Sequence, residues 1–153
     1  MRVAATALLA LALALPAGAA FAAEEQTPAR VVVILHPTNG TAAMDRSQLA
    51  QIYKGVRRAW NSQLRIAVYL PPTASPAMAK LAKDIFKLPR PEDVTTFYAN
   101  AVNRKIFTAA PQILATEAEV VKRVAAEPGA IGVVDAASVG EESLVKALPV
   151  AGL

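Results

Sequence analysis

The strongest constraint on the fold of this chain is a run of β-branched and aliphatic residues, RVVVIL, at Arg30–Leu35. Valine and isoleucine fit the pleated surface of a sheet. A strand that is apolar at every position, with no alternation of polar residues, is suited to burial on both of its faces. The run therefore predicts a central strand with other parts of the chain packed above and below it.

Helical and strand patterns alternate along the rest of the chain. The further strand patterns are LRIAVYL at 64–70, AIGVV at 130–134 and a last candidate at 144–150. The helical patterns begin at Asp45, where Gln48 completes a capping box, after Ser75, at Glu92, from which the pattern continues to Phe107, and at Thr116, where Glu119 predicts a second box. Such alternation is typical of an α/β domain, and we expect a mainly parallel sheet with helices on both faces.

Residues 1–22 have the pattern of a signal peptide. Arg2 provides a positive start, Val3–Leu15 is an apolar run, and Ala20-Phe21-Ala22 fits a small-x-small cleavage site. The apolar run is shorter than the roughly 20 residues that cross a bilayer. We therefore expect residues 23–153 to form a single domain that is exported to the periplasm and is not stably inserted in a membrane after cleavage.

Composition narrows the range of functions. The net charge of +4 is too small to indicate nucleic-acid binding, although it is compatible with an anionic ligand. The sequence has no cysteine and one histidine, so neither thiol catalysis nor a good metal site is expected. Phosphate-binding and dinucleotide-binding glycine motifs are also missing. We predict a non-enzymatic protein that needs no cofactor.

Two loops that follow predicted strands are candidates for a binding site. Parallel α/β domains bind ligands at the carboxyl ends of their strands, which here are followed by His36–Thr41 and Pro71–Ser75. Ser75 before Pro76 is a typical helix start, where free amides and the helix dipole favour an anion. The predicted ligand-binding residues are Thr73, Ala74, Ser75, Thr38 and Asn39, around one small anion.

Each of these residues also has a simpler explanation. Thr73 and Ser75 could serve only as turn and cap residues, and Asn39-Gly40 is an ordinary turn sequence. His36, the sole histidine, could have a ligand-binding or catalytic role, or it could be an ordinary polar surface residue. The basic residues Lys54, Arg57 and Arg58 could form a partner surface or a solvated face, and Trp60 beside them is better explained as a packing residue.

Several of these segments, in this order, resemble a known family. The strand and loop VVVILHPTNG, the helix DRSQLAQIYKG, the basic stretch VRRAWN and the segment PGAIGVVDAAS are similar to the phosphate-binding periplasmic proteins of ABC transporters, and in particular to their short, single-domain relatives. The resemblance covers roughly Val31 to the C-terminus. It implies a fold like one lobe of a type II periplasmic binding protein.

The resemblance also implies a function. In that family the loop after the second strand usually reads Arg-x-x-Ser-Gly-Thr, and its hydroxyls and amides hold phosphate. Here Thr73 and Ser75 match in chemistry and position, whereas the arginine is absent and Ala74 replaces the glycine. We expect weak binding of a small oxyanion such as phosphate in an envelope uptake system, with an envelope or transporter protein as a possible partner. The alternative is a protein-interaction module that kept the fold and lost the ligand.

Overall fold

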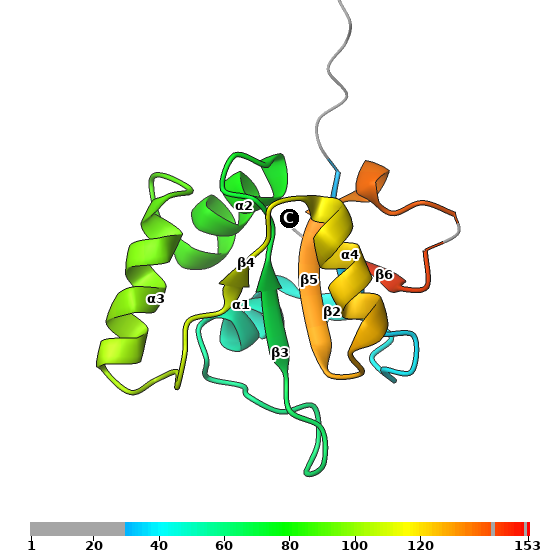
Figure 1. The fold of residues 1–153 in the computed structure, drawn as a ribbon, viewed down its shortest axis with the longest axis horizontal. Helices are drawn as coiled ribbons and strands as arrows, with labels where there is room; N and C mark the ends of the chain where they lie inside the picture. The colour runs from blue at the N-terminus through cyan, green and yellow to red at the C-terminus, as the bar shows by residue number, and fades with distance from the viewer. Residues whose placement is uncertain (1–29, 142, 152) are drawn as a thin grey trace, which may run out of the picture.

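The computed structural model describes residues 30–141, 143–151 and 153, so the predicted signal peptide lies outside the described residues. Within the described part, six strands form one sheet in the order β2-β6-β1-β5-β3-β4, with helices around it (Figure 1). The strands are β1 (Val31–Leu35), β2 (Met44–Asp45), β3 (Ala67–Leu70), β4 (Gln112–Ile113), β5 (Ala130–Asp135) and β6 (Lys146–Ala151).

The sheet is mixed in direction. The pairs β2–β6, β3–β4 and β3–β5 are parallel, whereas β1 runs antiparallel to both of its neighbours, β5 and β6. Val33 on β1 lies opposite Val133 on β5 at the centre of the longest of these ladders. The α/β class is confirmed, and the reversed direction of the central strand β1 decides which loops share an edge of the sheet.

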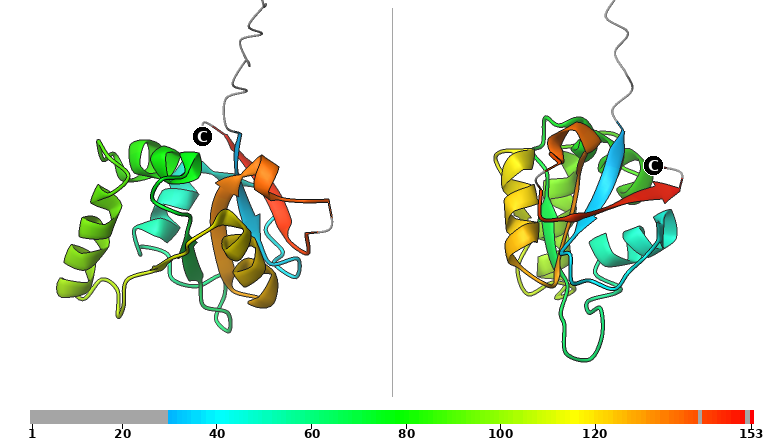
Figure 2. Two further views of the ribbon diagram at one scale, coloured as in Figure 1. Left: turned by 45° about the horizontal axis from the view of Figure 1, so that its top comes forward. Right: turned by 90° about the vertical axis from the view of Figure 1, so that its right-hand side faces the viewer.

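The strand β1 is buried on both faces, as its composition predicts. Val31, Val33 and Leu35 belong to one hydrophobic cluster, and Val32 and Ile34 belong to the other. Helix α4 (Glu117–Ala126) covers the second cluster, and the other helices cover the first (Figure 2). The prediction of helices on both faces of the sheet is therefore confirmed.

The remaining helices lie on the face of the first cluster. They are α1 (Arg46–Tyr53), α2 (Pro76–Lys80), which continues directly as the π-helical segment η1 (Leu81–Phe86), and α3 (Asp93–Asn103); a short 3₁₀ turn, η2 (Ala136–Ser138), follows β5. The capping box predicted for α1 is present, with Asp45 accepting from the Gln48 amide and the Gln48 side chain accepting from the Asp45 amide.

Two predicted elements have different limits in the structure. The helix expected from Glu92 to Phe107 ends at Asn103, where the chain turns back and the Ile106 amide donates to the Ala101 carbonyl. The strand expected at 64–70 begins only at Ala67. Residues before it form a small hairpin instead, in which the Trp60 amide donates to the Leu64 carbonyl at 2.8 Å. The two-residue strands β2 and β4 carry too little pattern for a sequence prediction.

The second predicted capping box is only half formed. Thr116 Oγ1 accepts from the Glu119 amide at 3.1 Å, as expected for an N-cap. The Glu119 carboxylate, however, accepts from the amide of Ala115 rather than from that of Thr116. Helix α4 therefore starts where the sequence predicts, with one contact moved by one residue.

An aromatic cluster joins the helices on the first face. The rings of Tyr53, Phe86, Phe97, Tyr98 and Phe107 meet in edge or tilted contacts, with centroids 4.9–6.3 Å apart. The Tyr98 hydroxyl donates to the Tyr53 carbonyl at 2.7 Å. Burial raises the pKa of both Tyr98 and Tyr53, so both phenols stay protonated donors at neutral pH.

Two motifs that carry the family resemblance contact one another directly. The Trp60 indole Nε1 donates to the Gly129 carbonyl at 3.0 Å, and the Ala67 amide donates to the same oxygen at 3.0 Å. A Cβ atom at Gly129 would lie 2.1 Å from the backbone oxygen of Arg65. Trp60 packs against the core, as predicted. The two motifs together attach the hairpin of residues 59–65 to the start of β5.

Candidate functional site

The loops after β3, β4 and β5 lie at one edge of the sheet, because these strands are parallel and their carboxyl ends point the same way. This edge, at the top of Figure 1, carries the segment Pro71–Ser75, the start of α4 and the η2 turn. It is the place where the fold brings polar loop residues together.

The Ser75 residue forms the N-cap of α2, as predicted. Its Oγ accepts from the Met78 amide at 3.1 Å, and its own amide donates to the Pro72 carbonyl at 2.9 Å. Pro76 has no N–H, and Ala77 and Met78 are fully buried. The helical amides are thus either bonded, absent or covered, so α2 offers an external anion fewer donors than an ordinary helix start.

The donors that remain come from the loop itself. The amides of Thr73 and Ala74 make no hydrogen bond within the described part of the chain. The Thr73 and Ser75 hydroxyls each have a proton to donate, since Ser75 Oγ only accepts from Met78. The loop therefore offers two amides and two hydroxyls, which are a small set of neutral donors without a cation.

The loop opens into a shallow hollow beside α2. Thr73, Ala74 and Ser75 line it together with Pro91 and Glu92, among others. Glu92 contacts Arg90 at 4.0 Å, a distance at which an exposed ion pair neutralises little. A carboxylate in the wall lowers the attraction for an anion, which adds a second reason to expect weak binding here.

The His36–Thr41 loop lies at the opposite edge of the sheet. Because β1 is antiparallel to β5 and β5 is parallel to β3, the loops after β1 and β3 are at opposite ends. Thr38 and Asn39 therefore cannot hold the same anion as Ser75, and the expectation of one shared site is wrong in this respect. The cause is the direction of β1, which an evenly apolar strand does not encode.

Local hydrogen bonds explain most of this loop as a turn. Thr38 contacts His36 Nδ1 through both its hydroxyl, at 2.7 Å, and its amide, at 3.2 Å. Asn39 is 6% exposed, and its Oδ1 accepts from the Thr41 amide, while its carbonyl accepts from Lys146 Nζ. Asn39 Nδ2 is buried and has no hydrogen-bond partner among the described residues. The turn interpretation of Asn39-Gly40 accounts for the geometry.

Glu117 lies at the upper edge of the sheet, and it was not identified from the sequence as a candidate site residue. Its Oε2 accepts from the Asp135 amide at 3.0 Å and from the Ser138 hydroxyl, and it therefore joins α4 to the end of β5. Its Oε1 is buried without a partner in the described residues. The only signal for it in the sequence is an acidic residue after a cap, which is ordinary for a first helical turn.

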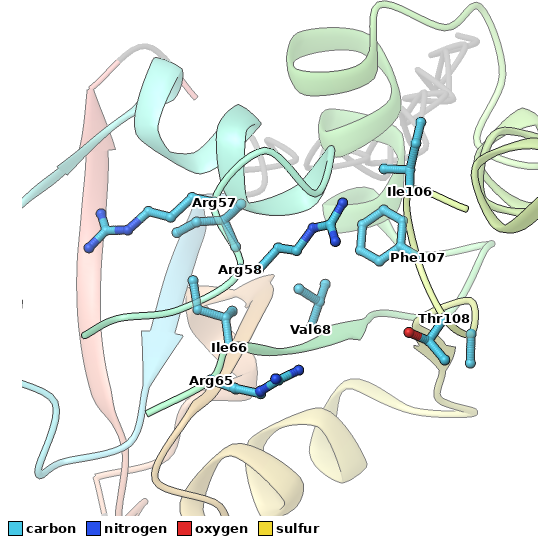
Figure 3. A pocket seen from close by; sticks show the side chains of 10 residues that line it. Arg57, Arg58, Arg65, Ile66, Val68, Ile106, Phe107 and Thr108 are labelled. Atoms are coloured by element: carbon cyan, nitrogen blue, oxygen red, sulfur yellow. The ribbon is translucent and has the colours of Figure 1, made fainter. Parts of the chain in front are cut away.

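The basic residues do not form a single patch. Arg57 Nε donates to the Ala59 carbonyl, and its guanidinium lies 5.4 Å from the Trp60 ring. Arg58 Nε donates to the Gly55 carbonyl at 3.0 Å. Figure 3 shows the two guanidinium groups pointing in opposite directions. Lys54 is at the C-cap of α1. The predicted partner surface is thus divided between two directions.

Among residues 30–141, 143–151 and 153, no group of three histidine, cysteine or acidic side chains could hold a metal ion. No helix in that part of the chain is long and apolar enough to cross a membrane.

Comparison with known proteins identifies the family. A family model described as a PBP superfamily domain matches residues 29–151, so the chain belongs to this family. No protein among the curated ones gives a significant match.

Similar solved structures share the fold. They include an ABC-type phosphate transport receptor from Vibrio cholerae (18% identity, TM-score 0.56) and PstS from Borrelia burgdorferi (15%, 0.55). A third, from Clostridium perfringens, was solved with bound phosphate as a candidate phosphate ABC transporter substrate-binding protein (19%, 0.57). Each match covers 80% of this chain and 46%, 47% and 45% of the respective relative, so the chain spans about half the length of these proteins.

Proposed function

We propose that this chain is an exported, non-catalytic solute-binding domain that binds a small oxyanion of the phosphate type weakly, at the loop Thr73–Ser75, as part of an envelope uptake system. The observation that carries the proposal is the set of neutral donors at the carboxyl end of β3: the unbonded amides of Thr73 and Ala74 and the hydroxyls of Thr73 and Ser75. Membership of the PBP superfamily and the phosphate in one structural relative support the same ligand class.

The expected affinity follows from what the site contains. A bidentate arginine would add charge-assisted hydrogen bonds, and this loop has no arginine. The Glu92 carboxylate lies in the wall, and the hollow is open to water. We therefore expect dissociation constants on the order of micromolar to millimolar, which rise with added salt because the interaction is partly electrostatic and exposed.

Two substitutions separate a ligand contact from a helix cap. Ser75→Ala removes the acceptor for the Met78 amide, so it should lower the free energy of unfolding by about 1 kcal/mol. If the hydroxyl also donates to the ligand, phosphate affinity should fall by roughly fivefold. Thr73→Ala should weaken phosphate binding to a similar extent with little change in stability. Urea unfolding and calorimetric titration measure the two effects.

A helix cap that does not line the hollow gives the matched control. Thr116 caps α4 in the same way, with Oγ1 accepting from the Glu119 amide at 3.1 Å. Thr116→Ala should therefore cost a similar free energy of unfolding and leave phosphate affinity unchanged. If Thr116→Ala and Ser75→Ala weaken phosphate binding equally, the loss reflects stability and not contact with the ligand.

A protein-interaction module is the second candidate function. It is favoured by Glu92 in the hollow and by the lack of an arginine in the loop Pro71–Ser75. In that case the basic residues Lys54, Arg57 and Arg58 would contact an envelope protein. Retained co-purification of envelope proteins with a variant that has glutamate at all three positions would argue against this surface.

Export is part of the proposal, and it rests on the sequence pattern of residues 1–22. Cleavage after Ala22 should leave Ala23 as the first residue of the protein in the periplasm. Intact-mass measurement of protein recovered from a periplasmic extract tests this expectation. A mass that includes Met1 in that fraction would contradict it.

A further inference from the structure

A cavity of about 220 Å³ lies at the lower edge of the sheet, between the end of α1, the start of β3 and the segment after α3. Arg57, Arg58 and Arg65 line it, together with apolar side chains that include Val68 and Phe107 (Figure 3). Arg57 turns its guanidinium away toward Trp60, whereas Arg58 and Arg65 lie on either side of Val68. Two cations thus flank an apolar surface.

The charges of Arg58 and Arg65 are not neutralised by neighbouring carboxylates. In the described part of the chain, the ion pairs within 4.0 Å involve Lys80 and Arg90 and none of the cavity arginines. Arg58 Nε donates to the Gly55 carbonyl. Among the described residues, the terminal nitrogens of Arg58 and the side chain of Arg65 make no hydrogen bond. Guanidinium groups that have free N–H donors and no paired carboxylate are suited to bidentate contact with a carboxylate or phosphate.

The apolar part of the cavity is an extension of the core that the fold leaves partly uncovered. Ile66, Val68 and Phe107 pack against the main hydrophobic cluster while remaining partly exposed. The Phe107 ring packs against that of Tyr98, with centroids 5.4 Å apart. It also lies close to Gly55, where an added Cβ would be 2.7 Å from Phe107 Cζ. The cavity therefore has a firm apolar floor with cations at its rim.

We propose that this cavity binds a small amphiphilic anion, with its carboxylate or phosphate between Arg58 and Arg65 and its apolar body against Val68 and Phe107. The volume of 220 Å³ corresponds to about seven water molecules at about 30 Å³ each, which suits a single ring or a short acyl chain. Apolar area then contributes to affinity beyond the charge, which inorganic phosphate alone does not provide.

This site is separate from the oxyanion site proposed at Thr73–Ser75. Arg65 precedes β3 and Ser75 follows it, so the two sites lie beyond opposite ends of the same strand (Figure 1). They also differ in chemistry, since one offers neutral donors and a nearby carboxylate and the other offers two guanidinium groups and an apolar floor. Failure of either proposal leaves the other standing.

Titration with phenyl phosphate, inorganic phosphate and benzyl alcohol tests the proposal, with the binding site located by amide NMR shifts. Phenyl phosphate should bind at least about tenfold more tightly than inorganic phosphate at this cavity, and benzyl alcohol should bind more weakly than phenyl phosphate. The largest shifts should occur at Val68 and Phe107. Arg65→Gln should weaken phenyl phosphate binding by about tenfold.

Matched variants identify the source of any change. Arg123→Gln removes the same charge from α4, on the other face of the sheet, and should leave phenyl phosphate affinity unchanged. Thr73→Ala should also leave it unchanged. Val68→Thr keeps the shape of the floor and adds a hydroxyl, so it should weaken phenyl phosphate and not inorganic phosphate. Equal affinities for the two phosphates, or equal losses in Arg65→Gln and Arg123→Gln, would overturn the proposal.

Discussion

Gly129→Ala is expected to lower the free energy of unfolding by about 3 kcal/mol, at the upper end of the range for overpacking. The added Cβ would lie 2.1 Å from the Arg65 carbonyl oxygen, which is a backbone atom and cannot rotate away. The backbone must shift, and the shift would disturb the bonds from Trp60 Nε1 and the Ala67 amide to the Gly129 carbonyl. Urea unfolding followed by fluorescence of the single tryptophan measures the change.

Gly40→Ala is the matched control, because a Cβ there would meet nothing within 4 Å. The same chemical change should then alter the free energy of unfolding by no more than about 0.5 kcal/mol. The tryptophan emission of folded Gly40→Ala should equal that of the wild type. If both glycine variants unfold at the same urea concentration, the close contact between the hairpin and β5 is not a source of stability.

Phe86→Ala is expected to cost about 3–5 kcal/mol, the usual range for removing a buried phenylalanine ring. Phe86 is 6% exposed, and its ring contacts those of Tyr53, Phe97 and Tyr98. Its loss would leave a cavity where α1, η1 and α3 meet. Thermal and urea unfolding should both show the large decrease.

Two further variants bracket this expectation. Phe86→Leu keeps most of the buried volume and should cost clearly less than Phe86→Ala. Val56→Ala, at a side chain that is 75% exposed, should change the free energy of unfolding by less than about 0.5 kcal/mol. A cost below about 1 kcal/mol for Phe86→Ala would show that the aromatic cluster is not the structural centre that its contacts indicate.

Local features of the fold could be predicted from the sequence because their causes lie within a few residues. The caps at Asp45, Ser75 and Thr116 each depend on an amide three residues away, and all three start a helix in the structure. The burial of β1 follows from its composition alone. Such interactions leave a pattern that can be seen without knowledge of the rest of the chain.

Features that depend on distant partners could not be predicted in the same way. The direction of β1 is set by pairing with β5 and β6, nearly 100 residues or more further along the chain, and an apolar run is compatible with either direction. The contact between Trp60 and Gly129 likewise joins two motifs that each predict only a turn. Because β1 runs antiparallel to β5, the predicted ligand residues are divided between two edges of the sheet.

The place of Thr73 and Ser75 between a strand and a helix could be predicted from the sequence, whereas their hydrogen bonds could not. The sequence places Thr73 and Ser75 after a strand and before a helix, and the structure keeps them there. Which amides are free depends on the contact from Ser75 to Pro72 and on the burial of Ala77 and Met78. Arg65 lies within the strand predicted at 64–70, and only the fold makes it line the same cavity as Phe107.

The central claim of weak oxyanion binding at Thr73–Ser75 is tested most directly by titrating phosphate into the isotopically labelled wild-type protein and following its amide NMR signals. We predict saturable shifts for Thr73 and Ala74, whose amides have no partner in the described chain, with a dissociation constant on the order of micromolar to millimolar that rises with salt. An absence of shifts at these two amides up to millimolar phosphate, at low ionic strength, would contradict the claim.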